Sequence, residues 1–500
     1  MKNILEMLEY SAERFPDKYV FRDENTDMTY AEFLRTAKSI GTDIAKHGIN
    51  NKPIAVIAER SAGCLAAMFG VLYSGNFYTV IDSEMPPERV KAIFDTLKPA
   101  AVVVTKACLS LLKKLDFNGK AVNYETAKDC PLDGDRLLKI RERMIDSDPA
   151  YALFTSGSTG IPKGAVVSHK AVLSYVKWYA DTFKIDENTV FGSQTPFYFS
   201  MSVSDVFSTV YAGGELNIIP KTLFSFPMKL LEFLNERKVN TIYWVPSALC
   251  IIANWRVLDY GELKYIKKVL FAGEVMPTRQ LNYWIAKLPN AMFANLFGPT
   301  ETTDICTYYI VDRKFRDGET LPIGRACDNC DVFVVKEDGT EAKTGEEGEL
   351  YARGSFLAMG YYNNPEKTAA AFVQNPLNTA YPETVYKTGD LVKYNEKGEL
   401  IYISRIDFQI KHMGYRIELG EIEAAASALD GVTSCAAVYD SNNDKIILVY
   451  EGKKREITEI LSELGARLPE YMMPQIVKRI KSMPHNANGK IDRKKILEEI

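Results

Sequence analysis

Hydrophobic and polar positions follow two different patterns along the chain. Up to about residue 323, apolar runs of strand length, such as 53–58 and 78–81, are followed by amphipathic stretches of helical length, 61–74 and 87–97. Strands separated by helices of about 10–15 residues are typical of a parallel sheet that is covered on both faces. The pattern therefore predicts parallel-type α/β subdomains in the first two thirds of the chain.

From about residue 324 the pattern changes. Short apolar segments are separated by glycine turns, which predicts a β-rich subdomain over about 324–406. Beyond residue 407 the segments 418–429, 434–440, 446–451 and 456–468 form a compact mixed pattern of about 90 residues. We expect a large N-terminal core, residues 1–406, and a smaller, mobile α+β domain, residues 407–500.

Composition and charge narrow the range of functions. The chain has 500 residues, too many for one compact core. Its 61 basic residues nearly balance 65 acidic ones, so no overall field attracts nucleic acid or anionic lipid. Charges interrupt the apolar positions of the N-terminus, unlike in a signal peptide, and the apolar runs are far shorter than the ~20 residues that span a bilayer. We expect a cytoplasmic protein without nucleic-acid partners or membrane insertion.

The cysteines and histidines do not predict a metal site. Among eight cysteines only Cys327 and Cys330 form a C-x-x-C pair, and none of the four histidines is suitably placed to complete a zinc site. Reduced thiols near a loop are favoured over a metal or redox site.

The sharpest local feature is the segment 155–164, which follows the apolar run 151–154. Its small residues let backbone N–H groups turn inward, its hydroxyls add donors, and Lys163 adds a positive charge, so it can wrap a polyphosphate. Pro162 precedes the lysine and Gly164 follows it, which disfavours a P-loop motor or kinase. The alternative is a flexible surface loop. The predicted phosphate-binding residues are Thr155, Ser156, Gly157, Ser158, Thr159, Gly160 and Lys163.

With this loop and five further segments in the same order, the chain resembles the acyl-adenylate-forming superfamily, which includes acyl-CoA synthetases, luciferases and the adenylation domains of nonribosomal peptide synthesis. The further segments are 295–303, 348–350, 386–390, 404–407 and 488–493. The resemblance covers essentially the whole chain and is strongest to stand-alone ligases of the D-alanine–carrier-protein type. It implies that ATP activates a small carboxylic or amino acid as acyl-AMP and that the acyl group then passes to a thiol.

The resemblance assigns roles to the matched residues. Phe297 would stack on adenine and Asn295 would bond its edge. Glu301 would hold Mg²⁺, and Thr300 would reach the α-phosphate. Asp390 would accept hydrogen bonds from both ribose hydroxyls, and Arg405 would contact ribose or phosphate. The nucleotide-binding residues implied in this way are Asn295, Leu296, Phe297, Gly298, Pro299, Thr300, Asp390, Tyr402 and Arg405.

Lys490 is the predicted catalytic cation, with Glu301 and Thr300 as its partners in catalysis. Attack of one anion on another is opposed electrostatically, so an ammonium must neutralise both the carboxylate and the phosphorus transition state. Asp407 stands at the family's hinge position. In a second domain orientation the segment 411–421 would replace Lys490 beside the adenylate, ready for thiol attack.

The acyl pocket departs from the pattern of α-amino-acid-activating relatives. Ser200 stands where they carry an aspartate for the substrate ammonium, and a buried ammonium without a partner is costly. Asp304 stands where they usually have a neutral side chain. A carboxylate there would suit an amine displaced along the substrate, as in a β-amino acid, or a differently oriented small amino acid; alternatively, it caps a turn or faces water. The other predicted lining residues, which suggest a modest acyl group, are Met201, Ser204, Leu270, Ala272 and Leu296.

The acceptor remains open at this point. Only seven residues follow Arg493, so we expect a phosphopantetheinylated carrier protein in trans. An acyl-CoA synthetase would differ only in the thiol. A non-catalytic nucleotide-binding scaffold is disfavoured because Lys490 and Glu301 are both present.

Overall fold

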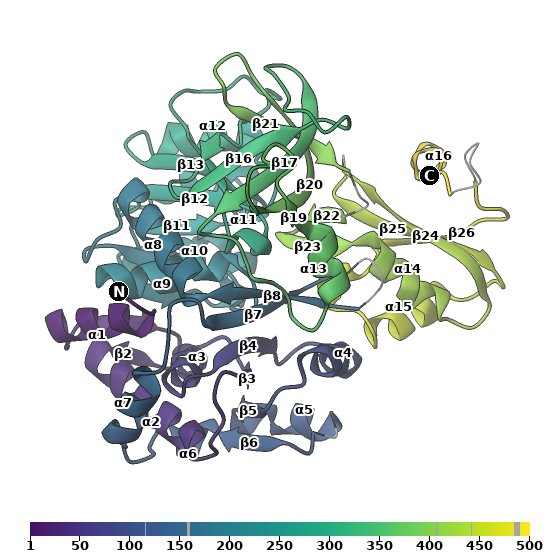
Figure 1. Ribbon diagram of the computed structural model, residues 1–500. Coiled ribbons are helices and arrows are strands. Elements are labelled where there is room, and N and C mark those ends of the chain that lie inside the picture. The colour runs from purple at the N-terminus through teal and green to yellow at the C-terminus, as the bar shows by residue number, and fades with distance from the viewer. Residues whose placement is uncertain (116, 158–160, 407–408, 442, 485–490) are drawn as a thin grey trace.

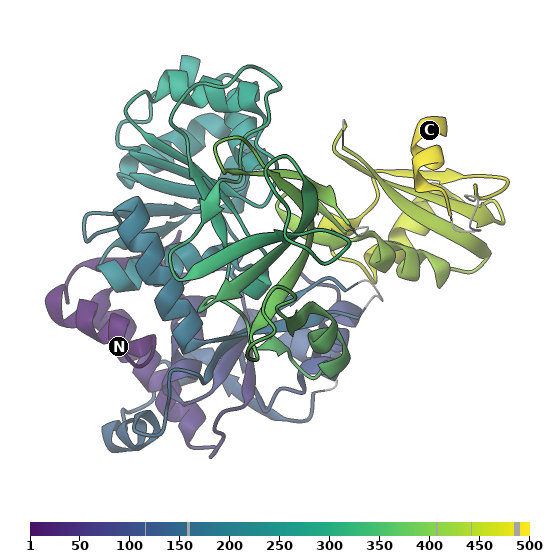
Figure 2. The same cartoon turned by 45° about the horizontal axis from the view of Figure 1, so that its top comes forward.

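The computed structural model describes residues 1–115, 117–157, 161–406, 409–441, 443–484 and 491–500 (Figure 1). It has a large N-terminal body and a smaller α+β domain at the C-terminal end, drawn in yellow-green (Figure 2). The predicted α/β class is confirmed. None of the helices in the described residues is long and apolar enough to cross a membrane.

A seven-stranded sheet within the described residues carries the predicted phosphate loop. Its strands, in spatial order, are β18 (Gly360–Tyr361), β8 (Lys163–Ser168), β7 (Pro149–Thr155), β4 (Phe77–Asp82), β3 (Pro53–Ala58), β5 (Ala101–Val104) and β6 (Lys120–Asn123). The strands from β7 to β6 are parallel, whereas β8 and β18 pair antiparallel at one edge. Strand β3 is apolar and buried at all six positions, as expected for a strand covered on both faces.

A nine-stranded sheet carries the predicted adenine and acyl pockets. Its order is β15 (Arg325–Ala326), β14 (Thr307–Ile310), β13 (Met292–Phe297), β12 (Lys268–Ala272), β11 (Thr241–Trp244), β9 (Val190–Ser193), β10 (Glu215–Ile218), β1 (Tyr19–Arg22) and β2 (Asp27–Thr29). Its centre is parallel, and β2, β14 and β15 are antiparallel at the edges. The parallel-type prediction therefore holds for the centres of both sheets but not for their edges.

The β-rich region forms a third sheet. It contains β16 (Cys330–Val335), β17 (Glu347–Gly354), β20 (Thr384–Tyr394) and β19 (Phe372–Gln374), with β21 (Leu400–Arg405) paired to β20. After it, β22 (Gln409–His412) and β23 (Tyr415–Glu418) form a hairpin. A last sheet contains β24 (Val432–Asp440), β25 (Lys445–Gly452) and β26 (Ile476–Arg479).

Helices cover the sheets and begin where the sequence provides caps. Helix α2 starts with a capping box in which Thr29 and Glu32 bond each other's backbone N–H groups. The helices of the body are α1 (Leu5–Arg14), α2 (Tyr30–Ala45), α3 (Ala62–Tyr73), α4 (Pro87–Leu97), α5 (Leu109–Lys114), α6 (Tyr124–Ala127), α7 (Gly134–Arg141), α8 (His169–Phe183), α9 (Met201–Ala212), α10 (Pro227–Glu236), α11 (Pro246–Asn254), α12 (Thr278–Lys287) and α13 (Pro365–Ala371). Those of the C-terminal domain are α14 (Leu419–Ser427), α15 (Ile457–Gly465) and α16 (Arg493–Glu499).

The buried hydrophobic residues fall into clusters that follow this division. The largest cluster extends from Ile4 to Leu400 and joins the three sheets of the body. A separate cluster from Ile417 to Val477 forms the core of the C-terminal domain. A separate core is what the predicted mobile domain would need in order to turn without unfolding, and this mobility stays a prediction. The boundary at Asp407 stays a prediction, since residues 407 and 408 lie outside the described residues.

Candidate active site

The predicted phosphate loop is the tip of the β7–β8 hairpin, where Thr155 pairs with Lys163. Gly157 has no room for a side chain, since a Cβ there would lie 2.1 Å from the carbonyl oxygen of Ile161. Ser158, Thr159 and Gly160 lie outside the described residues. The loop is therefore held at both ends by strands and packs tightly at its start.

Lys163 directs its charge toward two carboxylates. Its Nζ lies 3.9 Å from Oε1 of Glu301 and 3.8 Å from Oε1 of Glu418. Burial lowers the pKa of Lys163 to about 8. A partly buried cation beside the phosphate loop matches the role predicted for Lys163, which remains a prediction.

Glu301, the predicted magnesium ligand, is fully buried between cations. Its Oε2 accepts a hydrogen bond from Nη1 of Arg416 at 2.6 Å, and its Oε1 accepts one from the hydroxyl of Tyr361 at 2.6 Å. Burial would raise the pKa of Glu301, but the charges of Arg416 and Lys163 outweigh it and lower the pKa to about 2. The side chain is thus an ionised, hard oxygen donor, which fits Mg²⁺. In this domain orientation Arg416 supplies the positive charge.

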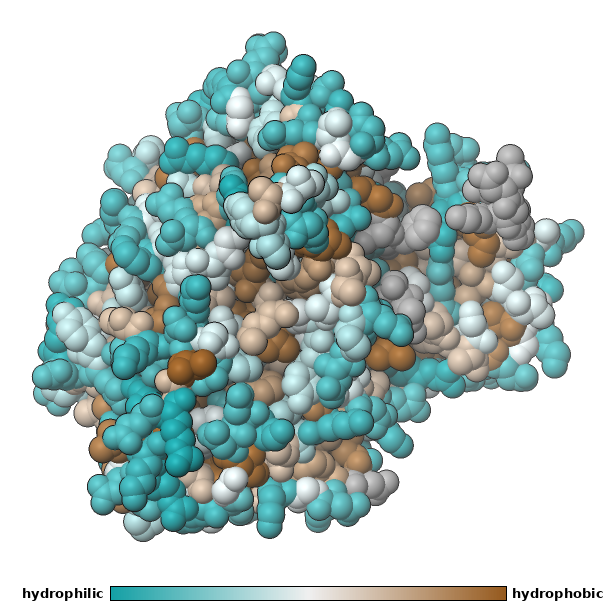
Figure 3. All heavy atoms as spheres, viewed as in Figure 1, coloured by the Kyte–Doolittle hydropathy of each residue, from teal (hydrophilic) through white to brown (hydrophobic). Residues whose placement is uncertain are grey.

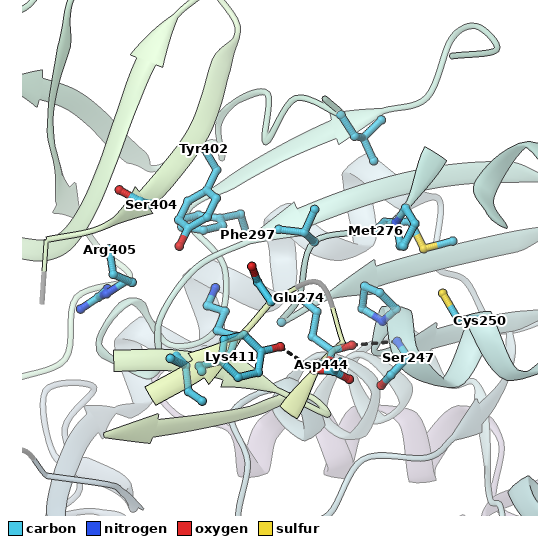
Figure 4. A pocket seen from close by; sticks show the side chains of 18 of the residues that line it. Ser247, Cys250, Glu274, Met276, Phe297, Tyr402, Ser404, Arg405, Lys411 and Asp444 are labelled. Atoms are coloured by element: carbon cyan, nitrogen blue, oxygen red, sulfur yellow. Dashed lines mark hydrogen bonds between the residues drawn. The ribbon is translucent and has the colours of Figure 1, made fainter. Parts of the chain in front are cut away.

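The predicted adenine site lies at the end of β13. The rings of Phe297 and Tyr402 are 5.8 Å apart, and the Asn295 amide donates to the carbonyl oxygen of Pro322. Lys411 from the C-terminal domain places its Nζ 4.3 Å from the centre of the Phe297 ring (Figure 4). Adenine could stack on that face of Phe297 only if the ammonium moved away, because both would occupy the same space.

Asp390 and Arg405 meet on neighbouring strands. Arg405 Nη1 lies 3.0 Å from Oδ1 of Asp390 and donates to the carbonyl oxygen of Thr388 at 2.6 Å. Both residues line cavities next to the adenine site. The structure thus brings together the two residues predicted to bind ribose and phosphate.

A cavity of about 1380 Å³ connects the adenine site with the space between the body and the C-terminal domain. Phe297, Tyr402 and Arg405 line one part of it, and Trp255 of the body and Leu497 of α16 line the other. Figure 4 shows Phe297, Tyr402 and Lys411 at one end and Ser247, Cys250 and Glu274 at the other. In Figure 3 a notch separates the C-terminal domain from the body on the surface.

A second cavity, of about 120 Å³, contains most of the predicted acyl-pocket residues. Its lining includes Ser200, Met201, Ala272, Thr300 and Asp304. Three predicted lining residues lie elsewhere. Leu270 is buried in β12 and lines neither cavity, Leu296 lines the larger cavity, and Ser204 lies behind Asp304. The small volume agrees with a modest acyl group.

Asp304 is held by hydroxyl groups. Its Oδ2 accepts hydrogen bonds from Ser204 at 2.7 Å, from Tyr243 at 3.0 Å and from Tyr175 at 3.2 Å. Only 2% of the residue is exposed, so the water-facing alternative is wrong. Neither tyrosine was predicted from the sequence. Tyr243 lies in β11, next to the strand β12 that carries Ala272, and this neighbourhood was the signal that could have pointed to it.

The β22–β23 hairpin of the C-terminal domain is seated on the site. Ser156 Oγ donates to the carbonyl oxygen of Arg416 and accepts from the backbone N–H of Glu418. The backbone N–H of Gly414 donates to Oε1 of Glu274 at 2.6 Å. This is the segment that the sequence analysis placed beside the adenylate in the second orientation. Lys490 and Asp407 lie outside the described residues.

The cysteines are free thiols in the structure. Cys327 and Cys330 are both buried and unbridged, and the described residues contain no group of His, Cys, Asp and Glu that could hold a metal ion. Glu301 therefore belongs to no such group of three or more side chains among the described residues, and Mg²⁺ bound through one or two carboxylates and nucleotide phosphates does not require one.

Comparison with known proteins decides the family. Residues 8–362 match the AMP-binding enzyme family. The chain belongs to this family. It is 30% identical over 512 residues to the D-alanine–D-alanyl carrier protein ligase of Bacillus cytotoxicus, covering 99% of each chain. It is 30% identical over 502 residues to tyrocidine synthase 1 of Brevibacillus parabrevis, where the match covers 99% of this chain and 45% of that protein.

The fold also matches solved structures of the family. Holo-PA1221, described as a nonribosomal peptide synthetase protein containing adenylation and carrier domains, has a TM-score of 0.85 at 22% identity over 100% of this chain and 84% of that one. Family membership confirms the predicted adenylate-forming ligase and implies that ATP is its nucleotide. The prediction of acyl-adenylate formation with transfer to a carrier protein agrees with the named relatives.

Proposed function

We propose that this enzyme joins a small carboxylic or amino acid to the phosphopantetheine thiol of a separate carrier protein in two steps. In the first step a carboxylate oxygen attacks the α-phosphorus of ATP, and pyrophosphate leaves. In the second step the thiolate attacks the acyl carbon, and AMP leaves. The relatives named as carrier-protein ligases support this acceptor.

The observation that carries the proposal is the cavity between the body and the C-terminal domain. It begins at Phe297 and Arg405, where the nucleotide would lie, and ends between Trp255 and Leu497 at the domain junction. A free amine or water would need no such path. A phosphopantetheine arm is long and narrow, so a cleft that leads from a domain junction to the adenylate fits it.

Different residues of the site would have different roles in the first step. Lys163 and the phosphate loop would bind the phosphates, and Asp390 with Arg405 would bind the ribose. Glu301 would hold Mg²⁺, which neutralises phosphate charge when it is bound. Thr300, whose hydroxyl donates to that of Ser200 at 3.3 Å, lies where the phosphate and acyl sites meet. Lys490 would neutralise the attacking carboxylate and the transition state.

The domain orientation described here would serve the second step. The hairpin bonds Ser156, Glu274 and Glu301 at once, and its tip packs against the body. In this orientation Arg416 pairs with Glu301 and neutralises its negative charge. In the first step Mg²⁺ would neutralise that charge instead. Rotation of the C-terminal domain would release Glu301 and bring Lys490 in.

Gly414 offers a direct test of the seated hairpin. Its φ is +79°, and a Cβ would lie 2.4 Å from Cγ1 of Val245. We expect Gly414→Ala to slow thioester formation about tenfold or more and to leave ATP–pyrophosphate exchange nearly unchanged. The matched control is Gly398→Ala, since Gly398 has a φ of +74° but nothing within 4 Å of the added Cβ. If both variants slow thioester formation equally, the effect comes from backbone strain alone and not from the contact of the hairpin with Val245.

The reaction itself is tested by two measurements on the full chain. Exchange of radioactive pyrophosphate into ATP, measured across a panel of small acids, reports the first step. Release of AMP with a phosphopantetheinylated carrier or with coenzyme A, measured at equal concentrations, reports the second. We expect the carrier to be the better acceptor; a preference for coenzyme A would identify an acyl-CoA synthetase. If no acid supports exchange, the proposed reaction is wrong.

A further inference from the structure

The floor of the acyl cavity is a buried carboxylate without a cation. Asp304 lines the cavity, and the three hydroxyl donors that bond its Oδ2 come from residues that do not line it. They therefore hold Oδ2 from outside the cavity lining, whereas Ser200, a further hydrogen-bond partner of the carboxylate, lines the cavity. Among the described residues no lysine or arginine forms an ion pair with Asp304, and cations are absent from its hydrogen bonds. A buried charge with no opposite charge is costly unless a ligand supplies one.

The supporting hydroxyls favour the ionised form of this carboxylate. Burial raises the pKa of Asp304 to about 6, and the hydrogen bonds from Ser204 and Tyr243 act in the opposite direction. At neutral pH most molecules would therefore carry a negative charge at the cavity floor. A hydrophobic acyl chain would have to cover that charge, whereas an ammonium group would neutralise it.

The depth of Asp304 indicates where the ammonium would lie along the substrate. Thr300 bonds Ser200 at the start of α9, on the side where the carboxyl group meets the phosphate. Asp304 is bonded to Ser204, four residues and about 6 Å further along the same helix, and its carboxylate also has Ser200 as a hydrogen-bond partner. The carboxylate that could receive an amine thus extends from Ser200 toward Ser204, away from the position where relatives carry their aspartate, and Ser200 itself carries no charge.

From these contacts we infer that the substrate is a short acid whose ammonium group lies beyond the α-carbon, a β- or γ-amino acid, and that Asp304 selects it by pairing with that ammonium. This inference rests on the proposed function and names its substrate class. Tyr175 and Tyr243 are positioning residues, since they fix the Asp304 carboxylate without lining the cavity. The cavity of about 120 Å³ agrees with a short chain.

The test compares isosteric analogues of the adenylate. Sulfamoyl-adenosines carrying β-alanyl or γ-aminobutyryl groups are matched with those carrying butyryl or pentanoyl groups, in which a methyl replaces the ammonium, and with an alanyl one. Their dissociation constants are measured by calorimetry for the wild-type protein, Asp304→Asn and Tyr243→Phe. We expect the wild type to favour one of the two displaced amines about a hundredfold over its isostere, because a site built for a polar group rejects the analogue that lacks it. Asp304→Asn should abolish this preference, and Tyr243→Phe should weaken it.

The outcomes separate this inference from the proposed function. Equal binding of amine and methyl analogues, preference for the alanyl analogue, or a preference that survives Asp304→Asn would overturn the inference and leave adenylate formation standing. Failure to bind every analogue would overturn both. Asp205→Asn is the matched control, since Asp205, on α9, is another buried acid and does not line the cavity. It should leave the preference unchanged, with the melting temperature recorded for every variant.

Discussion

Lys490→Ala should slow adenylate formation by at least about a hundredfold. The carboxylate and the α-phosphate are both anions, and removing one preorganised charge from such a transition state typically costs about 10²–10³ in rate. Lys163 and Arg405 remain in the site, but Lys163 lies beside Glu301 and Arg405 pairs with Asp390, all within the N-terminal body. They therefore cannot replace a cation supplied by the C-terminal domain. The measurement is ATP–pyrophosphate exchange with the best acid of the panel.

The same variant should keep the second step. In the orientation described here the hairpin, with Lys411 and Arg416, occupies the site, so transfer from preformed acyl-adenylate to the carrier should stay within about threefold of wild type. Lys481→Ala is the control, since it removes an exposed lysine from the same domain. Loss of both steps together would indicate damage to the domain, and an unchanged exchange rate would show that residue 490 is not the catalytic cation.

The sequence predicted elements whose signals are local. The strand over Pro53–Ala58 and the helix over Pro87–Leu97 occur where they were expected, because a continuous apolar run and a proline followed by amphipathic spacing are complete within a few residues. The antiparallel edges of the two large sheets were not predictable in this way. Pairing of β18 with β8 depends on where the chain returns after nearly 200 residues, and the direction in which β14 pairs with β13 depends on the turn between two consecutive strands.

The residues of the site also divide into those with a local sequence signal and those without one. The resemblance placed Phe297, Tyr402 and Arg405 in one pocket, and the structure brings them together. The contacts of Arg416 with Glu301, and of Lys411 with Phe297, join residues more than a hundred positions apart and carry no local signal. Leu270 was expected in the acyl pocket, but it is fully buried in β12 and lines neither cavity.

The second large effect on activity is expected from the buried ion pair between Arg89 and Glu421. Arg89 lies on α4 of the body and Glu421 on α14 of the C-terminal domain, and they form an ion pair with 5% and 4% of their side chains exposed. In the proposed rotation of the C-terminal domain, this pair would form only in the orientation described here. Breaking a buried pair by removing one partner costs about 3–5 kcal/mol, because the remaining charge has no partner.

Glu421→Gln should therefore depress thioester formation by about 10²–10³-fold and spare pyrophosphate exchange, since about 1.36 kcal/mol corresponds to a factor of ten. Arg89→Met should do the same. The double variant Arg89→Met/Glu421→Met should recover much of the second step, because replacing both charges with apolar groups of similar size is often nearly neutral. Rates of AMP release with the carrier, measured for the two single variants and the double variant, give the coupling between the two residues. Additive losses in the double variant, or equal losses in pyrophosphate exchange, would contradict a pair that acts only in the thiol-accepting orientation.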